Sequence, residues 1–194
     1  MTLVRKTGYP LICSYDNQGI YPEQSLYFFY ERNDVSNEYL LLLFNSSLYN
    51  WFYKNFLVTN IDSTPQLKNK DLDEFPIIQL NRNIEKEIKC LASYLLFLAK
   101  NNSTSISFLF FKEIADCLVF EIFLEKEVLV AKKGIIEHLQ DLKSIDDTSA
   151  DEQKLAIINS ELERLYDPYH PVRNNVETIE NIEIVRIIKE SLKK

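Results

Sequence analysis

The chain has 194 residues, of which 46% are hydrophobic and 26% are charged, and its formal net charge at pH 7 is −7. This composition is typical of a folded globular protein that buries a sizeable core, as one domain or as two small ones. Because Lys and Arg side chains supply most of the nonspecific affinity for phosphates, the acidic balance predicts weak DNA binding unless a local basic face or a partner domain adds positive charge.

The cysteines and the apolar runs bear on the cellular location. Cys13, Cys90 and Cys117 are widely spaced and include no Cys-x-x-Cys pair, so the sequence favours neither a disulfide framework nor a zinc site. Residues 1–13 lack the apolar core of a signal peptide, and no apolar run approaches the roughly 20 residues of a membrane-spanning helix. We therefore expect a cytoplasmic chain with no membrane partner.

The first part of the chain contains most of the tyrosines and prolines, which is typical of short strands and turns. A buried helix is predicted over residues 37–57, because apolar side chains surround this segment on all sides. Ser36 is its expected N-cap, and Glu38 lies in its positively polarised first turn. Strands are predicted over residues 9–15, 25–31 and 75–80, with a turn over residues 16–19.

Helical signals dominate from residue 81 onward. Asn83 is an expected N-cap, and Ser149-Ala-Asp-Glu152 has the spacing of a capping box. Pro168 and Pro171 predict a rigid turn before a last amphipathic helix. Helices are predicted over residues 84–100, 106–123, 126–143, 150–166 and 179–192.

Together these patterns predict an α+β fold in two parts. Residues 1–80 form a small sheet-containing module with one embedded helix. Residues 81–194 form a C-terminal helical bundle packed against that module.

Two regions carry a resemblance to a known family. In residues 39–53 an apolar helix is centred on Asn45-Ser46, and a polar loop that bears lysines then leads into Phe75-Pro-Ile77. This order resembles the C-terminal target-recognition domain of TaqI-like and Eco57I-like N6-adenine DNA methyltransferases and of the fused restriction-modification enzymes related to them. Residues 114–124 and 165–175, the latter with an Asp-x-x-His-Pro-x-Arg-Asn run, resemble the helical tail of the larger fused enzymes.

The resemblance implies recognition of double-stranded DNA rather than catalysis. The methyltransferases of this family hold the target adenine in an Asn/Asp-Pro-Pro-aromatic loop, and this sequence contains no Pro-Pro pair. Its glycines are isolated from one another, so no glycine-rich loop binds a methyl donor. We therefore expect the catalytic domain upstream of Met1, with S-adenosylmethionine as its cofactor and Mg²⁺ if the parent enzyme also cleaves DNA.

Other catalytic and metal-binding patterns are incomplete. The acid-x-Lys elements Glu87-Ile-Lys89 and Asp141-Leu-Lys143 are predicted on polar helix faces and have no upstream Pro-Asp partner for metal-dependent cleavage. His138 and His170 lack the spacing of metal ligands. The sequence predicts no catalytic residue, no metal site and no cofactor in this chain.

The loop at residues 64–70 is the main candidate for DNA contact. Gln66 and Asn69 have side chains that bond adenine edges bidentately, and Lys68 and Lys70 can meet phosphate or guanine. The alternative is that the loop only links helix to strand, with its lysines solvated. The predicted DNA-binding residues are Gln66, Lys68, Asn69, Lys70, Lys54 and Arg32.

Residues 167–173 form a proline-bounded turn with two interpretations. In the structural interpretation, Arg173 pairs with Asp167 to lock the turn and His170 fills the space between them. In the other interpretation, these side chains contact phosphate. Four aromatic residues at helical spacing are interpreted as core residues rather than base-stacking platforms, namely Trp51, Phe52, Tyr53 and Phe56.

We predict that the chain is the sequence-recognition module of a bacterial-type restriction-modification enzyme and is not itself an enzyme. The alternative is a protein-interaction module, in which the acidic helical half docks the parent's catalytic domain or another subunit of a restriction complex. A basic concave face around Lys68 would favour DNA, and a flat apolar patch would favour protein. A third hypothesis, an independent enzyme, has no catalytic constellation behind it.

Overall fold

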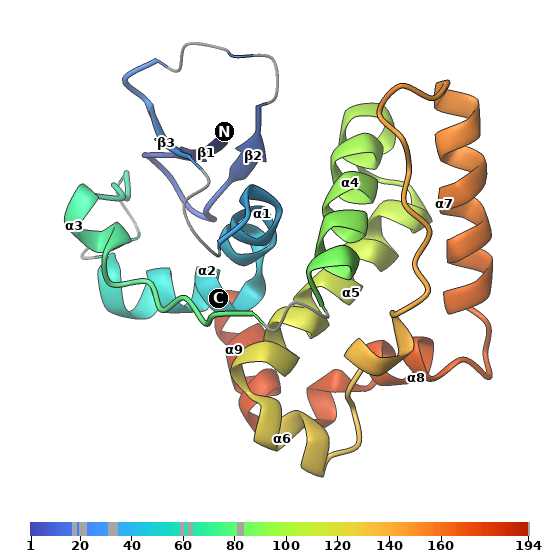
Figure 1. The fold of residues 1–194 in the computed structure, drawn as a ribbon. Helices are drawn as coiled ribbons and strands as arrows, with labels where there is room; N and C mark the ends of the chain where they lie inside the picture. Colours follow the sequence, from blue (N-terminus) through green and yellow to red (C-terminus); the bar gives the residue numbers. More distant parts are fainter. Residues whose placement is uncertain are drawn as a thin grey trace. The chain divides into compact units, whose positions relative to one another are not determined.

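The computed structural model describes residues 1–16, 19, 23–30, 35–58, 61, 64–80 and 84–193. Its contacts divide the chain into two compact units, the first comprising Met1–Leu80 with Ile187–Lys194 and the second Asn81–Arg186. A small antiparallel sheet lies in the first unit, and the second is helical, which confirms the predicted α+β class (Figure 1).

The sheet of the first unit has the strand order β2-β1-β3 among the described residues. The central strand β1 (Thr2–Arg5) pairs antiparallel with β2 (Cys13–Tyr15) and with β3 (Leu26–Phe29). We did not predict β1, because four residues are too few to show alternation. The strands predicted over residues 9–15 and 25–31 are longer than those observed; Pro10, within the first, has no N–H to donate to a ladder.

The helix predicted over residues 37–57 is interrupted. Ser36 is the N-cap as predicted, with its hydroxyl accepting the Tyr39 N–H at 3.2 Å. The prediction of one continuous helix was wrong, because the backbone of Ser46 is extended (φ −76, ψ 155). The Ser46 hydroxyl donates to the Leu43 carbonyl oxygen at the end of the first helix and accepts the Tyr49 N–H at the start of the second. The observed elements are α1 (Asn37–Asn45), α2 (Ser47–Phe52) and the π-helix η1 (Tyr53–Leu57).

The predicted strand over residues 75–80 was also wrong. After the short helix α3 (Asn69–Leu72) these residues run without a ladder partner in the described part of the chain, and Pro76 cannot donate to one. Their carbonyl oxygens instead accept hydrogen bonds from buried tyrosine hydroxyls, Pro76 from Tyr49 and Ile78 from Tyr39. The side chain of Phe75 anchors this segment in the core against Phe44 and Tyr49, at ring-centroid distances of 5.2 and 5.0 Å.

The second unit is built around α5 (Ile106–Phe123), which packs against α4 (Glu85–Asn102), α7 (Asp151–Leu165) and α8 (Pro171–Glu177). The prediction of α5 was confirmed at both ends, and Ser105 caps it by accepting the Phe108 N–H at 3.1 Å. Asn83, the N-cap predicted for α4, lies outside the described residues, as do parts of the predicted turn at 16–19. The remaining elements are α6 (Glu125–Val130), the 3-10 helices η3 (Ile136–His138) and η4 (Ile179–Asn181), and α9 (Glu183–Leu192), which crosses the border between the units.

The helix predicted over residues 126–143 was wrong, because the chain turns sharply after α6. Lys132 adopts φ 55, in the left-handed region that ends a helix. The Glu121 carboxylate then holds the next segment by accepting the N–H groups of Ile135 and Ile136 at 2.6 and 3.0 Å. Burial raises the pKa of this carboxyl, and the two backbone bonds partly offset that rise.

Two further helix boundaries differ from the prediction. Ala150, not Ser149, is the N-cap of α7, so the predicted capping box does not form. The predicted helix 179–192 is divided at Ile182, which is extended at ψ 116 between η4 and α9. Helix α8 was not predicted, and Pro171 occupies its first turn, where a missing N–H costs nothing.

Candidate nucleic-acid interface

The recognition loop, residues 64–70, is fixed to the backbone that continues β1. An isolated antiparallel bridge joins Thr7 to Gln66. Two backbone hydrogen bonds flank the bridge, from the Gly8 N–H to the Pro65 carbonyl oxygen at 2.8 Å and from the Leu67 N–H to the Lys6 carbonyl oxygen at 2.7 Å. The loop backbone is therefore held by the sheet, although the strand predicted after it is absent.

Side chains of the recognition loop alternate between the core and solvent. Pro65 and Leu67 are buried, whereas Gln66 and Lys68 are exposed. Alternation every second residue is typical of extended backbone, and the bridge to Thr7 holds the loop in that conformation. Asn69 and Lys70 are also exposed, at the start of α3, so the four loop residues predicted to contact DNA all lie at the surface.

Asp71 stabilises the start of α3, at the end of the recognition loop. Its Oδ2 accepts the Lys68 N–H at 2.8 Å, and its own N–H donates to the Lys68 carbonyl oxygen at 2.9 Å. The Asp71 side chain is buried, whereas Asp73 and Glu74 are exposed. One of the three nearby acids therefore has a structural role and is turned away from the surface that carries the loop lysines.

Lys54 and Arg32 are the two predicted DNA contacts that lie outside the recognition loop. The Lys54 ammonium donates to the Ser191 carbonyl oxygen at 2.6 Å and lies 5.7 Å from the centroid of the Tyr9 ring. These contacts occupy Lys54 within the first unit. Arg32 lies outside the described residues.

The aromatic residues at the end of α2 and in η1 lie partly in the core and partly at the surface. Tyr53 is fully buried, as predicted. Phe56 is 63% exposed and stacks on Phe52, with ring centroids 5.2 Å apart, while Trp51 meets Phe56 edge to face at 5.4 Å. The core prediction for Phe56 was therefore wrong, because the π-helix η1 carries this ring outward.

A comparison with protein families identifies this part of the chain. Residues 2–77 match the TaqI-like C-terminal specificity domain. The matched residues include the sheet, α1, α2 and the recognition loop, and they confirm the resemblance drawn from residues 39–53 and 65–77. The likeness of residues 114–124 and 165–175 to a helical tail lies beyond the specificity domain and stays a prediction. No curated protein and no solved structure matches the chain.

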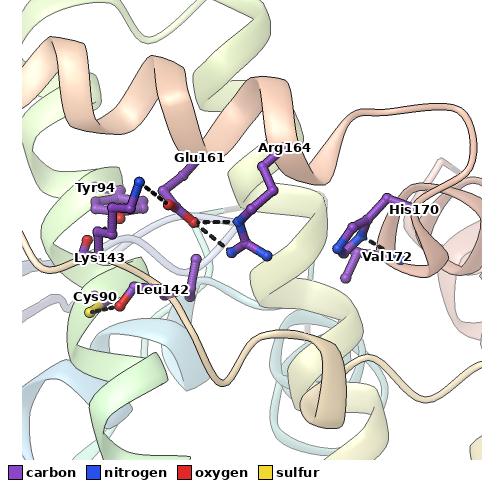
Figure 2. Close-up of polar contacts among 8 residues, drawn as sticks. All are labelled: Cys90, Tyr94, Leu142, Lys143, Glu161, Arg164, His170 and Val172. Atoms are coloured by element: carbon purple, nitrogen blue, oxygen red, sulfur yellow. Dashed lines mark hydrogen bonds and ion pairs between the residues drawn. The ribbon is translucent and has the colours of Figure 1, made fainter.

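Outside the specificity domain, the helical unit contains a buried polar cluster around Glu161, which the sequence analysis missed (Figure 2). The Glu161 carboxylate is 1% exposed, and its Oε2 accepts from both Nε and Nη2 of Arg164, at 3.1 and 2.6 Å. Its Oε1 lies 3.6 Å from the ammonium of Lys143. The sequence signal was available, because Glu161 falls on the same face of α7 as the buried residues Ile158 and Leu165.

The Glu161 cluster joins α7 to α4 and to the segment that follows η3. On α4, the Tyr94 hydroxyl donates to the Lys143 carbonyl oxygen, and the Cys90 thiol lies 3.8 Å from the Leu142 carbonyl oxygen. Burial raises the pKa of the Cys90 thiol; the charge of Lys86 partly offsets this rise, and the nearby acids Glu87 and Glu161 add to it. The Cys90 side chain is buried and packs within this cluster.

Neither acid-x-Lys element is placed for cleavage chemistry. Glu87 is buried, not on a polar helix face, and its Oε2 has no hydrogen-bond partner among the described residues. Asp141 lies in a turn, and Lys143 pairs with Glu161 instead. In the described ranges, no group of three or more His, Cys, Asp or Glu side chains is arranged to hold a metal ion. None of the helices within those ranges has the length and hydropathy needed to cross a membrane.

The turn at residues 167–173 is locked differently from the prediction. Arg173 pairs with Glu177 at 2.8 Å, not with Asp167, and its Nη1 donates to the Tyr166 carbonyl oxygen at 2.9 Å. Asp167 accepts the Tyr169 N–H at 2.8 Å. His170 caps α8 because its Nδ1 accepts the Val172 N–H at 3.2 Å. The physical reason is helical spacing, since Arg173 and Glu177 are one turn apart on α8.

Proposed function

We propose that the specificity domain reads DNA sequence for an N6-adenine methyltransferase or a fused restriction-modification enzyme. The match over residues 2–77 carries this proposal, because it includes a loop with the side chains that DNA readers use. Exposed amide and ammonium groups on a fixed backbone support it further, since a reader with rigid positions loses little conformational entropy on binding.

Within this proposal the loop residues have two roles. Gln66 and Asn69 contact base edges and set the sequence preference, because a side-chain amide presents a donor and an acceptor together. Lys68 and Lys70 contact phosphates and set affinity for all sequences alike. Lys54 contributes less, because its ammonium is already bonded to the Ser191 carbonyl oxygen.

The test is selection from a randomised duplex pool by the full chain at low salt, followed by affinity measurements on the enriched duplex and its single mismatches. Gln66→Ala or Asn69→Ala should cost roughly 1 to 3 kcal/mol and relax preference at one base position. Lys68→Ala and Lys70→Ala should weaken every duplex equally. The control is Lys126→Ala, which removes an exposed lysine from the helical unit. A pool with no enriched sequence, together with unchanged binding in all four loop variants, would refute the function.

We further propose that the chain has no catalytic activity of its own, with S-adenosylmethionine and any Mg²⁺ acting in an upstream catalytic domain. Methyl transfer from S-adenosylmethionine and plasmid cleavage with Mg²⁺ are the two assays. Turnover that co-purifies with the chain and disappears in a point variant of it would contradict this proposal.

Protein docking is the alternative function, and exposed isoleucines on α9 favour it. Ile184 and Ile187 are 40% and 49% exposed and lie three residues apart on one helix face. If docking is the function, Ile184→Ala and Ile187→Ala should release a partner while loop substitutions leave DNA binding unchanged. The DNA-reading proposal predicts the opposite pattern in the same set of variants.

A further inference from the structure

The bridge between Thr7 and Gln66 defines a short two-stranded ribbon, made of residues 5–8 and 65–68. The two backbone hydrogen bonds beside the bridge join Gly8 to Pro65 and Leu67 to Lys6. No backbone hydrogen bond joins Thr7 to Gln66. This is the pattern of a non-hydrogen-bonded antiparallel pair. Side chains of such a pair lie closest together, about 4.5 to 5.5 Å apart at Cβ.

Thr7 and Gln66 point to the same side of the ribbon, because directly opposed residues share a face. Both are exposed, whereas Leu67 on the other side is 2% exposed. Lys6, next to Thr7, also points to that other side, since its ammonium lies 4.5 Å from the centroid of the Tyr27 ring. The outward face of the ribbon therefore presents a threonine beside the amide that we propose reads adenine.

The backbone of residues 5–8 is held on both sides. The Arg5 N–H donates to the Ile12 carbonyl oxygen and the Lys6 N–H to the Ser25 carbonyl oxygen, each at 3.0 Å. Gly8 has φ +97, a backbone conformation that L side chains rarely adopt, so this position favours glycine. Thr7 is consequently fixed in direction, as a specificity-determining residue must be.

We propose that Thr7 is a specificity-determining residue that contacts the C5-methyl group of thymine, in the base pair whose adenine Gln66 contacts. An A·T pair presents N6 and N7 of adenine beside the thymine methyl group in the major groove, and that groove admits a two-stranded ribbon. A glutamine matches the adenine edge and a threonine methyl group matches the thymine methyl. This inference rests on the proposed function and assigns it a second residue, from a segment far away in the sequence.

The experiment replaces each thymine of the selected duplex in turn by uracil, which lacks only the C5-methyl group, and measures affinity for the full chain. Wild type should prefer thymine over uracil at one position by about four-fold, the factor equivalent to burying one methyl group. Thr7→Ser, which removes only the side-chain methyl group, should abolish this preference. Thr7→Val, which keeps a methyl group and removes the hydroxyl, should retain it.

Two measurements keep the outcome unambiguous. Thr104→Ser, the same change at an exposed threonine of the helical unit, should leave the preference for thymine intact. Equal urea midpoints for wild type, Thr7→Ser and Thr7→Val would show that folding is unchanged. A selective wild type whose thymine preference survives in Thr7→Ser overturns the role of Thr7 alone, whereas a chain without any sequence preference overturns the proposed function and this inference together.

Discussion

The Asn50 side chain bonds the backbone of Leu11, with Oδ1 accepting the Leu11 N–H at 2.7 Å between two buried residues. A second asparagine makes a similar contact nearby, because Asn45 accepts the Cys13 N–H at 3.1 Å and donates to the Cys13 carbonyl oxygen at 3.0 Å. Two helix side chains thus satisfy backbone groups that a neighbouring strand would otherwise bond. Asn50 anchors the connection between β1 and β2, which also contains Thr7, and Asn45 anchors the first residue of β2.

Asn50→Ala should destabilise the chain by about 2 kcal/mol, because it leaves the buried Leu11 N–H without its acceptor. Asn45→Ala should cost about 1 kcal/mol or less, since Asn45 is exposed and water can replace its bonds. The measurement is urea unfolding of both variants and wild type. An Asn45→Ala cost equal to or larger than that of Asn50→Ala would contradict this account of the two anchors.

DNA binding by the chain should be weak and strongly dependent on salt. With two to four phosphate contacts, the slope of log affinity against log salt concentration should be about −2 to −4. Lys68→Ala and Lys70→Ala should each reduce its magnitude by about 1. Fluorescence anisotropy over a series of salt concentrations measures the slope. Tight binding that is insensitive to salt would refute the electrostatic argument.

Removing Arg164 should destabilise the helical unit more than removing Glu161. Arg164→Met leaves a carboxylate that is 1% exposed and whose remaining partner is the 61% exposed Lys143 ammonium at 3.6 Å, so it should cost about 3 kcal/mol or more. Glu161→Met leaves Arg164 and Lys143, which are 35% and 61% exposed and can be hydrated, so its cost should be about 1 kcal/mol or less. Chemical denaturation checks the order, with Glu163→Met as the exposed control on the same helix. The reverse order would show that the buried charge is not what Arg164 stabilises.

The stability of the chain should depend on the protonation of His170. Burial, with smaller contributions from the charges of Arg164 and His138, lowers the pKa of His170 below its ordinary value of 6.5. The unfolded chain therefore takes up the proton first, so the contribution of neutral His170 is complete above about pH 6.5 and is lost as the pH falls through the folded-state pKa. Protonation also removes the Nδ1 acceptor that caps α8.

The measurement is an NMR titration of the His170 ring together with unfolding at several pH values. His170→Asn keeps a side-chain acceptor at the N-cap and has no titrating group, so the variant should lose less stability than wild type between about pH 6.5 and 5. A His170 pKa at or above 6.5 in the folded chain would contradict the prediction.

The sequence by itself determined the features that depend on neighbouring residues. Ser36 was predicted correctly as an N-cap, and α5 was predicted at both ends, because capping and apolar periodicity act within a few residues. The family resemblance was also available from local patterns, and the match over residues 2–77 confirms it.

Tertiary structure decided the features that depend on residues far apart in the chain. The pairing of Thr7 with Gln66, the burial of Glu161 beside Arg164 and Lys143, and the turn after α6 that Glu121 holds were not predicted. The contacts of Thr7 with Gln66, of Glu161 with Lys143 and of Glu121 with Ile135 each join segments that are separate in the sequence. For Glu161, the pattern of α7 indicates burial but does not identify Lys143 as a partner. Local propensity is a weak term that such contacts override, because burying a side chain or satisfying a buried backbone group is worth more free energy than the preference of one residue for helix or strand.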